Sequence, residues 1–277
     1  MLGVPLGGAE FKQAELQVLL LKVAKFCQRV VDLDHPQAAM LLLSKCCGVC
    51  RVAHTLKVLH PSVVSDFVFE FDKVMLDTLE QVAGFALDDL KRSQAALPVR
   101  LGGLGLQSAV ALSPVAFLVA SWAFQTQGKE ALALPEFGDT ETFFPQSELA
   151  KVCSLLPGSS VLPRAWLAEG ALPEDPKDEW LHQKWWISQV EKQQLEKLVC
   201  KSTGRDVVRL QCLSRQASGA WLHAIPSKGL GLEISPALFR TLLKFWFGAP
   251  ILDEVADGSG APFVPAPVTS RPLLQED

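Results

Sequence analysis

The first part of the chain places apolar and polar residues with the spacing of an amphipathic helix. Its apolar positions share one helical face: Leu16, Leu19, Leu20, Val23, Cys27 and Val30. The basic residues Lys22, Lys25 and Arg29 fall on the other side of the same helix. The spacing therefore predicts a helix over 12–31 with one buried face and one solvated face.

Prolines and glycines mark the helices that follow. Pro36 suits the first turn of a helix over 36–58, and Pro61 begins another helix that ends at Gly84. Further helical patterns are predicted at 86–95, 107–127, 177–202, 204–213, 218–224 and 235–247. Because no segment shows a strong period of two, the sequence predicts a mostly α fold without an antiparallel sheet.

Changes in composition divide the chain into four regions. A first helical block covers 1–127, and a proline-rich connector of loops and short helices covers 128–176. A second helical block follows at 177–252. The tail at 253–277 is rich in proline and glycine, which predicts disorder.

The charge balance limits the partners that the chain can bind. The net charge is −4 over 277 residues, of which 49% are hydrophobic. The hydrophobic content allows a sizeable core. Because the chain has no basic domain, any binding of nucleic acid has to use a local basic surface.

The cysteine count and the absence of targeting patterns predict an intracellular protein, in the cytoplasm or the nucleus. Seven cysteines, an odd number, fit reduced thiols better than a disulfide framework. The start, MLGVPLGGAEFKQ, has no basic segment followed by an apolar one, so we expect no signal peptide. The apolar run Ala109–Phe124 falls short of the roughly 20 residues of a bilayer span, so we expect no membrane segment.

The stretch AALPVRLGGLGLQSAVAL contains three glycines, Gly102, Gly103 and Gly105, in front of an apolar helix. A dinucleotide-binding loop has the pattern G-x-G-x-x-G after a buried strand, but here Ser108 stands at the third glycine position. The preceding ALPVRL contains a proline and is short for a central strand. We therefore interpret the glycines as a structural turn.

Two other groups have the residue types of metal sites. Cys47 and Cys50 have the spacing of zinc ligands and would share a helix face with His54, but no second pair of ligands lies nearby. Buried thiols that face a core are the favoured interpretation. Asp88 and Asp89 resemble a polymerase metal dyad, but their surroundings are helical, so we interpret them as a solvated helix start.

An aromatic and basic cluster begins the second block. It consists of Trp180, Trp185, Trp186, Lys184, Lys192 and Lys197. Tryptophans among cations can stack on bases, but packing in a helical core explains them as well. Because the histidines form no nucleophile arrangement either, the sequence predicts no catalytic residue, no metal site and no cofactor.

Several stretches in the same order resemble the reverse transcriptases of LINE-like (non-LTR) retrotransposons. LGVPLGGAEF resembles the segment that follows their catalytic palm, and DLDHPQAAMLLLSKCCGVC resembles the next helical block. LPVRLGGLGLQS is similar to the family's Leu-Pro-x-Arg-x-Gly-Gly-Leu-Gly-Leu stretch. GAWLHAIPSKGLGLEISPALFRTLLKFWFGAP is similar to the region beyond the thumb. The resemblance covers 1–127 and 177–251.

The resemblance implies a palm end and thumb-like helical region over 1–127 and a downstream helical linker region over 177–252. The sequence has no tyrosine and no aromatic-x-Asp-Asp box, so the metal-binding aspartates of the family have no counterpart here. The resemblance thus implies a non-catalytic fragment. A family thumb lays helices along the template–primer backbone, with Lys22, Lys25, Arg29 and Arg100 as the expected phosphate contacts.

Two hypotheses of function follow. In the first, the fragment contributes weak, sequence-independent binding of RNA or an RNA–DNA hybrid, and a separate polypeptide supplies a palm. In the second, the chain is a helical protein-interaction or scaffold domain without a nucleic-acid role, which the near-neutral charge favours.

Overall fold

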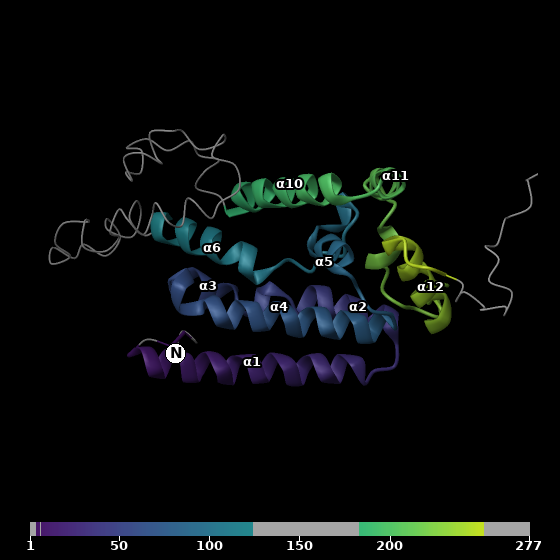
Figure 1. Cartoon of the computed structure of the whole chain (residues 1–277). Coiled ribbons are helices and arrows are strands. Elements are labelled where there is room, and N and C mark those ends of the chain that lie inside the picture. Colours follow the sequence, from purple (N-terminus) through teal and green to yellow (C-terminus); the bar gives the residue numbers. More distant parts are fainter. Residues whose placement is uncertain (1–3, 6, 124–182, 252–277) are drawn as a thin grey trace, which may run out of the picture.

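The described part of the chain is mainly helical. The computed structural model describes residues 4, 5, 7–123 and 183–251, and within these ranges it contains helices and turns but no strand (Figure 1). The prediction of a mostly α protein with two helical blocks is confirmed. The connector at 128–176, the tail at 253–277 and Trp180 lie outside the described residues.

Two long parallel helices form the base of the first block. α1 (Ala9–Val31) packs along α4 (Pro61–Ala83), and the side-chain amide of Gln13 donates a hydrogen bond of 3.0 Å to the carbonyl of Val63. The apolar face predicted for α1 is the face that is buried against α4. α4 ends where predicted, because Gly84 adopts the left-handed conformation (φ 77°) that closes a helix.

The prediction of one continuous helix over 36–58 is wrong. α2 (Pro36–Leu42) passes into a π-helical turn at Leu43–Cys47, and Gly48 then adopts an extended conformation (φ −63°, ψ −165°). A short 3₁₀ turn follows, and α3 (Ala53–Val58) completes the segment. The break leaves the carbonyl of Cys46 outside the helical ladder.

Arg51 provides a partner for that carbonyl. Its Nε donates a hydrogen bond of 2.8 Å to the carbonyl oxygen of Cys46, and its guanidinium lies 4.1 Å from the ring centroid of Phe26. A side chain from beyond the break thus replaces the lost backbone bond, which local helix propensity does not reveal.

The break also separates the cysteines. Cys47 is buried, whereas Cys46 and Cys50 are exposed. The prediction that Cys47 and Cys50 share a helix face with His54 is therefore wrong. Of the three cysteines Cys46, Cys47 and Cys50, only Cys47 is a buried thiol that faces the core. No group of three or more metal-ligand side chains occurs among the described residues.

A glycine turn joins the next two helices. α5 (Asp89–Ala96) begins at Asp88, whose carboxylate accepts a hydrogen bond from the backbone N–H of Lys91 at 2.9 Å. This contact agrees with the interpretation of Asp88 and Asp89 as a helix start. After the turn comes α6 (Ala109–Ala123), which packs on α3 and α4.

The second block covers the first from two directions (Figure 1). α10 (Gln183–Lys201) lies over α5 and α6, and α11 (Gly204–Leu213) follows it. A 3₁₀ turn at Ala220–His223 leads to α12 (Pro236–Phe247), which contacts α2 and α4. Side chains from both blocks share one hydrophobic core.

One stretch of the described chain, Pro36–Val58, has the length and the mean hydropathy (1.3) that a bilayer span requires. In the structure this stretch is divided at Gly48, and 44% of its most apolar 18 residues are buried. The core helix of a soluble protein satisfies the same criterion.

Candidate functional site

The basic residues predicted as phosphate contacts fall on two distant surfaces. Lys22, Lys25 and Arg29 are exposed on α1, on the side that faces away from α4. Arg100 pairs with Glu191 of α10, and α10 lies on the opposite side of the molecule from α1 (Figure 1). The structure therefore does not bring the four side chains together into one site.

Arg100 has an internal partner. Its guanidinium forms a salt bridge with Glu191 of α10, whose side chain is only 7% exposed, and Gln107 donates a further hydrogen bond of 3.3 Å to the same carboxylate. A buried carboxylate is costly to leave uncompensated, so Arg100 stabilises the packing of α10 on the glycine turn. The side chain of Arg100 nevertheless remains 61% exposed.

The glycine turn has no free N–H groups to offer a phosphate. The backbone N–H groups of Gly102, Gly103 and Gly105 all donate to backbone carbonyls of residues 97–99. A phosphate-binding loop needs such groups pointing outward at the ligand. Gly102 and Gly105 have positive φ (83° and 76°), so the glycines serve the shape of the chain here.

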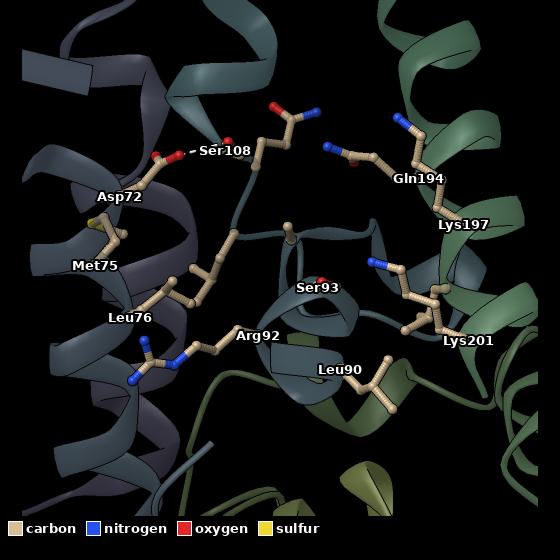
Figure 2. A pocket seen from close by; sticks show the side chains of 14 residues that line it. Asp72, Met75, Leu76, Leu90, Arg92, Ser93, Ser108, Gln194, Lys197 and Lys201 are labelled. Atoms are coloured by element: carbon tan, nitrogen blue, oxygen red, sulfur yellow. Dashed lines mark hydrogen bonds between the residues drawn. The ribbon is translucent and has the colours of Figure 1, made fainter. Parts of the chain in front are cut away.

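A cavity of about 330 Å³ opens between α4, α5 and α10 (Figure 2). Its floor is apolar and consists of Met75, Leu76, Leu90, Ala96, Leu106 and Leu198. Its polar lining consists of Asp72, Arg92, Ser93, Gln107, Ser108, Gln194, Lys197 and Lys201. An apolar floor with a few convergent polar groups is the usual construction of a ligand site.

α10 supplies the positive charge of this cavity. Lys197 and Lys201 are four residues apart, so they lie one helical turn from each other on the same face, and both are exposed. Figure 2 shows Gln194 and Lys201 reaching from α10 toward the middle of the cavity. Within the described ranges neither lysine forms a salt bridge, which leaves two ammonium groups available to an anion.

The third cation of the cavity is already compensated. Arg92 extends from α5 toward α4, where its guanidinium forms a salt bridge of 2.8 Å with Glu80 and its Nε donates to the carbonyl of Leu87. The hydrogen bond to Glu80 raises the pKa of Arg92 above its ordinary value. Arg92 is therefore a fixed wall of the cavity, while the two lysines carry its net positive charge.

Asp72 lies at the α4 side of the cavity and caps α6. Its carboxylate accepts hydrogen bonds from the hydroxyl of Ser108 (2.5 Å) and from the backbone N–H groups of Ala109 (2.7 Å) and Val110 (3.3 Å). Burial raises the pKa of Asp72, and these three donors act against that rise. A carboxylate held in this way positions the start of α6.

The tryptophans at the start of α10 divide between packing and surface. Trp186 is 3% exposed, and Trp185 meets it edge to face with the ring centroids 4.9 Å apart. Packing in the core thus explains Trp186. Lys184 and Lys192 are exposed on the same helix, but they do not line the cavity.

Sequence reasoning named Lys197 within the tryptophan cluster but missed Arg92 and Lys201 as site residues. The spacing of Lys197 and Lys201 was a usable signal, since it places both on one helical face. A lysine in a last helical turn, such as Lys201, ordinarily complements the helix dipole, so the spacing alone did not point to a site. The opposing wall from α4 and α5 is a product of the tertiary fold.

Comparison with known proteins adds no relative. No family model, no curated protein and no solved structure matches the chain.

Proposed function

We propose that the chain is a non-catalytic piece of a LINE-like reverse transcriptase that binds the backbone of RNA or an RNA–DNA hybrid without regard to sequence. The observation that carries the proposal is the cavity between α4, α5 and α10, which Lys197 and Lys201 line without a carboxylate partner in the described chain. Phosphate groups are the anions that such a pair of ammonium groups fits in a thumb-like protein.

The expected binding is weak and depends on salt. Two lysines release about two counterions from a nucleic acid, so the affinity falls steeply as salt rises. The net charge of −4 adds a repulsive background, which confines binding to the local basic surface. Lys22, Lys25 and Arg29 on α1 form a second exposed basic surface, and they lie too far from the cavity to join the same contact.

The proposal includes no catalytic role. The sequence lacks the aromatic-x-Asp-Asp box of the family, so nucleotidyl transfer would need a palm from a separate polypeptide. Templates of this kind occur in the cytoplasm and the nucleus, and we place the chain there. The six cysteines in the described ranges are free thiols, which fits a reducing compartment.

Fluorescence anisotropy with a labelled RNA–DNA hybrid tests the proposal. We expect detectable binding at low salt, and we expect the double variant Lys197→Glu/Lys201→Glu to abolish it. The milder pair Lys197→Gln/Lys201→Gln should reduce the slope of log affinity against log salt by about 2. The matched control is Lys184→Glu/Lys192→Glu, which changes the same charge on the same helix outside the cavity.

The same measurement separates the two basic surfaces. If Lys22→Glu/Lys25→Glu/Arg29→Glu abolishes binding and the cavity variants do not, the contact lies on α1 instead. If the unaltered chain does not bind the hybrid at low salt, the proposal of nucleic-acid binding is wrong.

A protein-interaction domain is the second candidate, and one observation favours it. The outer face of α1 exposes Phe11 (52%), Val18 (41%) and Leu21 (68%), and no described element covers them. Large apolar side chains on one helical face are typical of a protein interface. In a LINE-like context the partner is the palm-containing polypeptide, and a complex that survives high salt and is lost in Phe11→Ser/Leu21→Ser would support this candidate.

A further inference from the structure

The cavity between α4, α5 and α10 has an apolar lining that binding of a phosphate backbone does not require. Backbone phosphates are held by cations on an open surface, and no apolar contact is needed. Here the two lysines stand at the edge of an apolar floor that includes Leu76, Leu90 and Leu198. The volume of about 330 Å³ falls at the lower end of the range of about 300–1,000 Å³ seen for small-molecule sites.

We propose that this cavity binds one nucleotide unit that ends in a phosphate, with the phosphate on Lys197 and Lys201 and the base on the apolar floor. The nucleotide can be free or can be the phosphorylated end of a strand, since both present the same chemistry. The inference rests on the proposed function, since that function is the reason to expect a nucleotide as the ligand. It adds that the ligand is an entire nucleotide unit and not only a run of phosphates.

Charge fixes the orientation of this ligand. Asp72 and Lys201 lie on opposite sides of the cavity, the first on α4 and the second on α10 (Figure 2). A phosphate is repelled by the carboxylate and attracted by the ammonium groups, so it sits against α10. Because Arg92 is held by Glu80, the lysine pair is the part of the lining with uncompensated positive charge.

The space between these two walls suits a flat, largely apolar group. Leu76 of α4, Leu90 of α5 and Leu198 of α10 all line it. Apolar side chains on both faces of a base are a common way to hold it outside a base stack. The apolar lining of the cavity therefore suits the faces of a base, whose edge is left to the polar lining.

The polar lining of the cavity includes groups that can bond a sugar or a base edge. The amide of Gln194 provides both a donor and an acceptor and points into the cavity (Figure 2). Ser93 donates its hydroxyl proton to the carbonyl of Asp89 at 2.7 Å, which leaves the hydroxyl oxygen able to accept. An amide that rotates to suit its partner does not select one base, so we expect little base preference.

Isothermal titration of the full chain with adenosine monophosphate, adenosine and inorganic phosphate tests the inference. We expect the monophosphate to bind at least about tenfold more tightly than either fragment, because it alone uses both the lysines and the floor. Lys197→Gln/Lys201→Gln should remove this advantage. Lys184→Gln/Lys192→Gln on the same helix should leave it unchanged.

A second variant tests the cavity apart from its charge. Ser93→Phe places a ring in the opening from an exposed position of α5, so it blocks the site with little burden on folding, which a thermal melt verifies. We expect Ser93→Phe to weaken the monophosphate by about tenfold or more while the lysines stay in place. Equal binding of inorganic phosphate and the monophosphate, or no effect of Ser93→Phe, would overturn the inference.

Hybrid duplexes separate the sources of the nucleotide and the two proposals. A duplex with an unpaired, phosphorylated 5′ end should bind more tightly than its unphosphorylated twin if strand ends are the ligand, and Ser93→Phe should erase the difference. Equal affinity of the two duplexes, with the monophosphate bound, assigns the cavity to free nucleotides. Hybrid binding that persists while the monophosphate does not bind overturns the nucleotide inference and leaves the proposed function standing.

Discussion

The side-chain oxygen of Gln37 on α2 accepts a hydrogen bond of 2.9 Å from the backbone N–H of Ile234, in the segment before α12. The amide nitrogen of the same side chain donates to the carbonyls of Ala224 (3.1 Å) and Leu232 (3.0 Å). Gln37 is 1% exposed, so these bonds form away from water. One buried amide thus fastens the second helical block to the first.

Replacing Gln37 by leucine should loosen that attachment. The substitution keeps the apolar bulk but leaves the N–H of Ile234 and two carbonyls without their partner, which costs about 2–3 kcal/mol of unfolding free energy. Chemical denaturation measures the loss, and hydrogen exchange should show faster exchange at the N–H of Ile234. Gln17→Leu, at an exposed position of α1, is the control and should change the stability little.

The glycine turn contains one glycine with no space for a side chain and one with open space beside it. A Cβ at position 103 would lie 2.0 Å from the carbonyl oxygen of Leu97, whereas a Cβ at position 105 would meet nothing within 4 Å. Gly103→Ala should therefore cost at least about 3 kcal/mol or prevent folding, because backbone atoms must move. Gly105→Ala should cost about 1 kcal/mol, since only its positive φ (76°) is strained.

Denaturant melts of the two glycine variants decide the point. Equal losses at the two positions would show that the backbone of the turn differs from the one described. The contrast also tests the structural role of the turn, since a loop that held phosphate would be affected in ligand binding rather than in stability.

The helices could be predicted from the sequence better than the cavity could, for a physical reason. Local signals define helix ends, and the Pro61 start and Gly84 end of α4 lay where the sequence predicted. Breaks that depend on distant side chains are not local. The division at Gly48 is held by Arg51 on the carbonyl of Cys46, and no helical period reports such a contact.

The candidate site was harder to predict because its walls come from three separate helices. Lys197 and Lys201 have a readable spacing, but the surface opposite them is formed by residues more than 90 positions earlier in the chain. The same holds for Arg100. Its positive charge suggested a phosphate contact, and only the tertiary fold places Glu191 beside it.

Cysteine labelling should report the break at Gly48. Cys46, Cys50, Cys200 and Cys212 are exposed, whereas Cys27 and Cys47 are buried. Brief treatment of the native protein with iodoacetamide, followed by peptide mass spectrometry, should modify the first four and spare the last two. Cys27 is spared even though the thiol of Cys47 donates a hydrogen bond to it and lowers its pKa to about 7.

Unfolding in urea provides the control for that experiment, because every thiol is then accessible. Protection of Cys50 together with Cys47 in the native state would contradict the described break, since a continuous helix would place these two thiols on one face.

The start of α11 should make stability depend on acidity. The hydroxyl of Thr203 donates to the carboxylate of Asp206 at 2.7 Å, and Arg209 is also beside it, so the pKa of Asp206 lies below its ordinary value of 3.8. The folded state thus favours the charged carboxylate. Its stabilising contribution is complete above about pH 4 and is lost as the pH falls through the lowered pKa.

Thermal melts at several pH values test this contribution. Asp206→Asn should lower the melting temperature near neutral pH, and the difference from the unaltered protein should shrink below about pH 4. Glu196→Gln, an exposed position on α10, should show no such convergence. A difference that stays constant down to low pH would assign the effect of Asp206→Asn to packing instead of charge.

Arg100 allows a direct test of structure against binding. Removing its guanidinium leaves the carboxylate of Glu191, 7% exposed, without its ion pair, although the exposure of Arg100 moderates the loss to about 1–2 kcal/mol. Glu191→Gln removes the charge that needs compensation, so the double variant Arg100→Ala/Glu191→Gln should be more stable than Arg100→Ala alone. The coupling is measured with a double-mutant cycle in denaturant. If the hybrid affinity is restored together with the stability, Arg100 acts by positioning α10; if the stability returns and the affinity does not, Arg100 contacts phosphate itself.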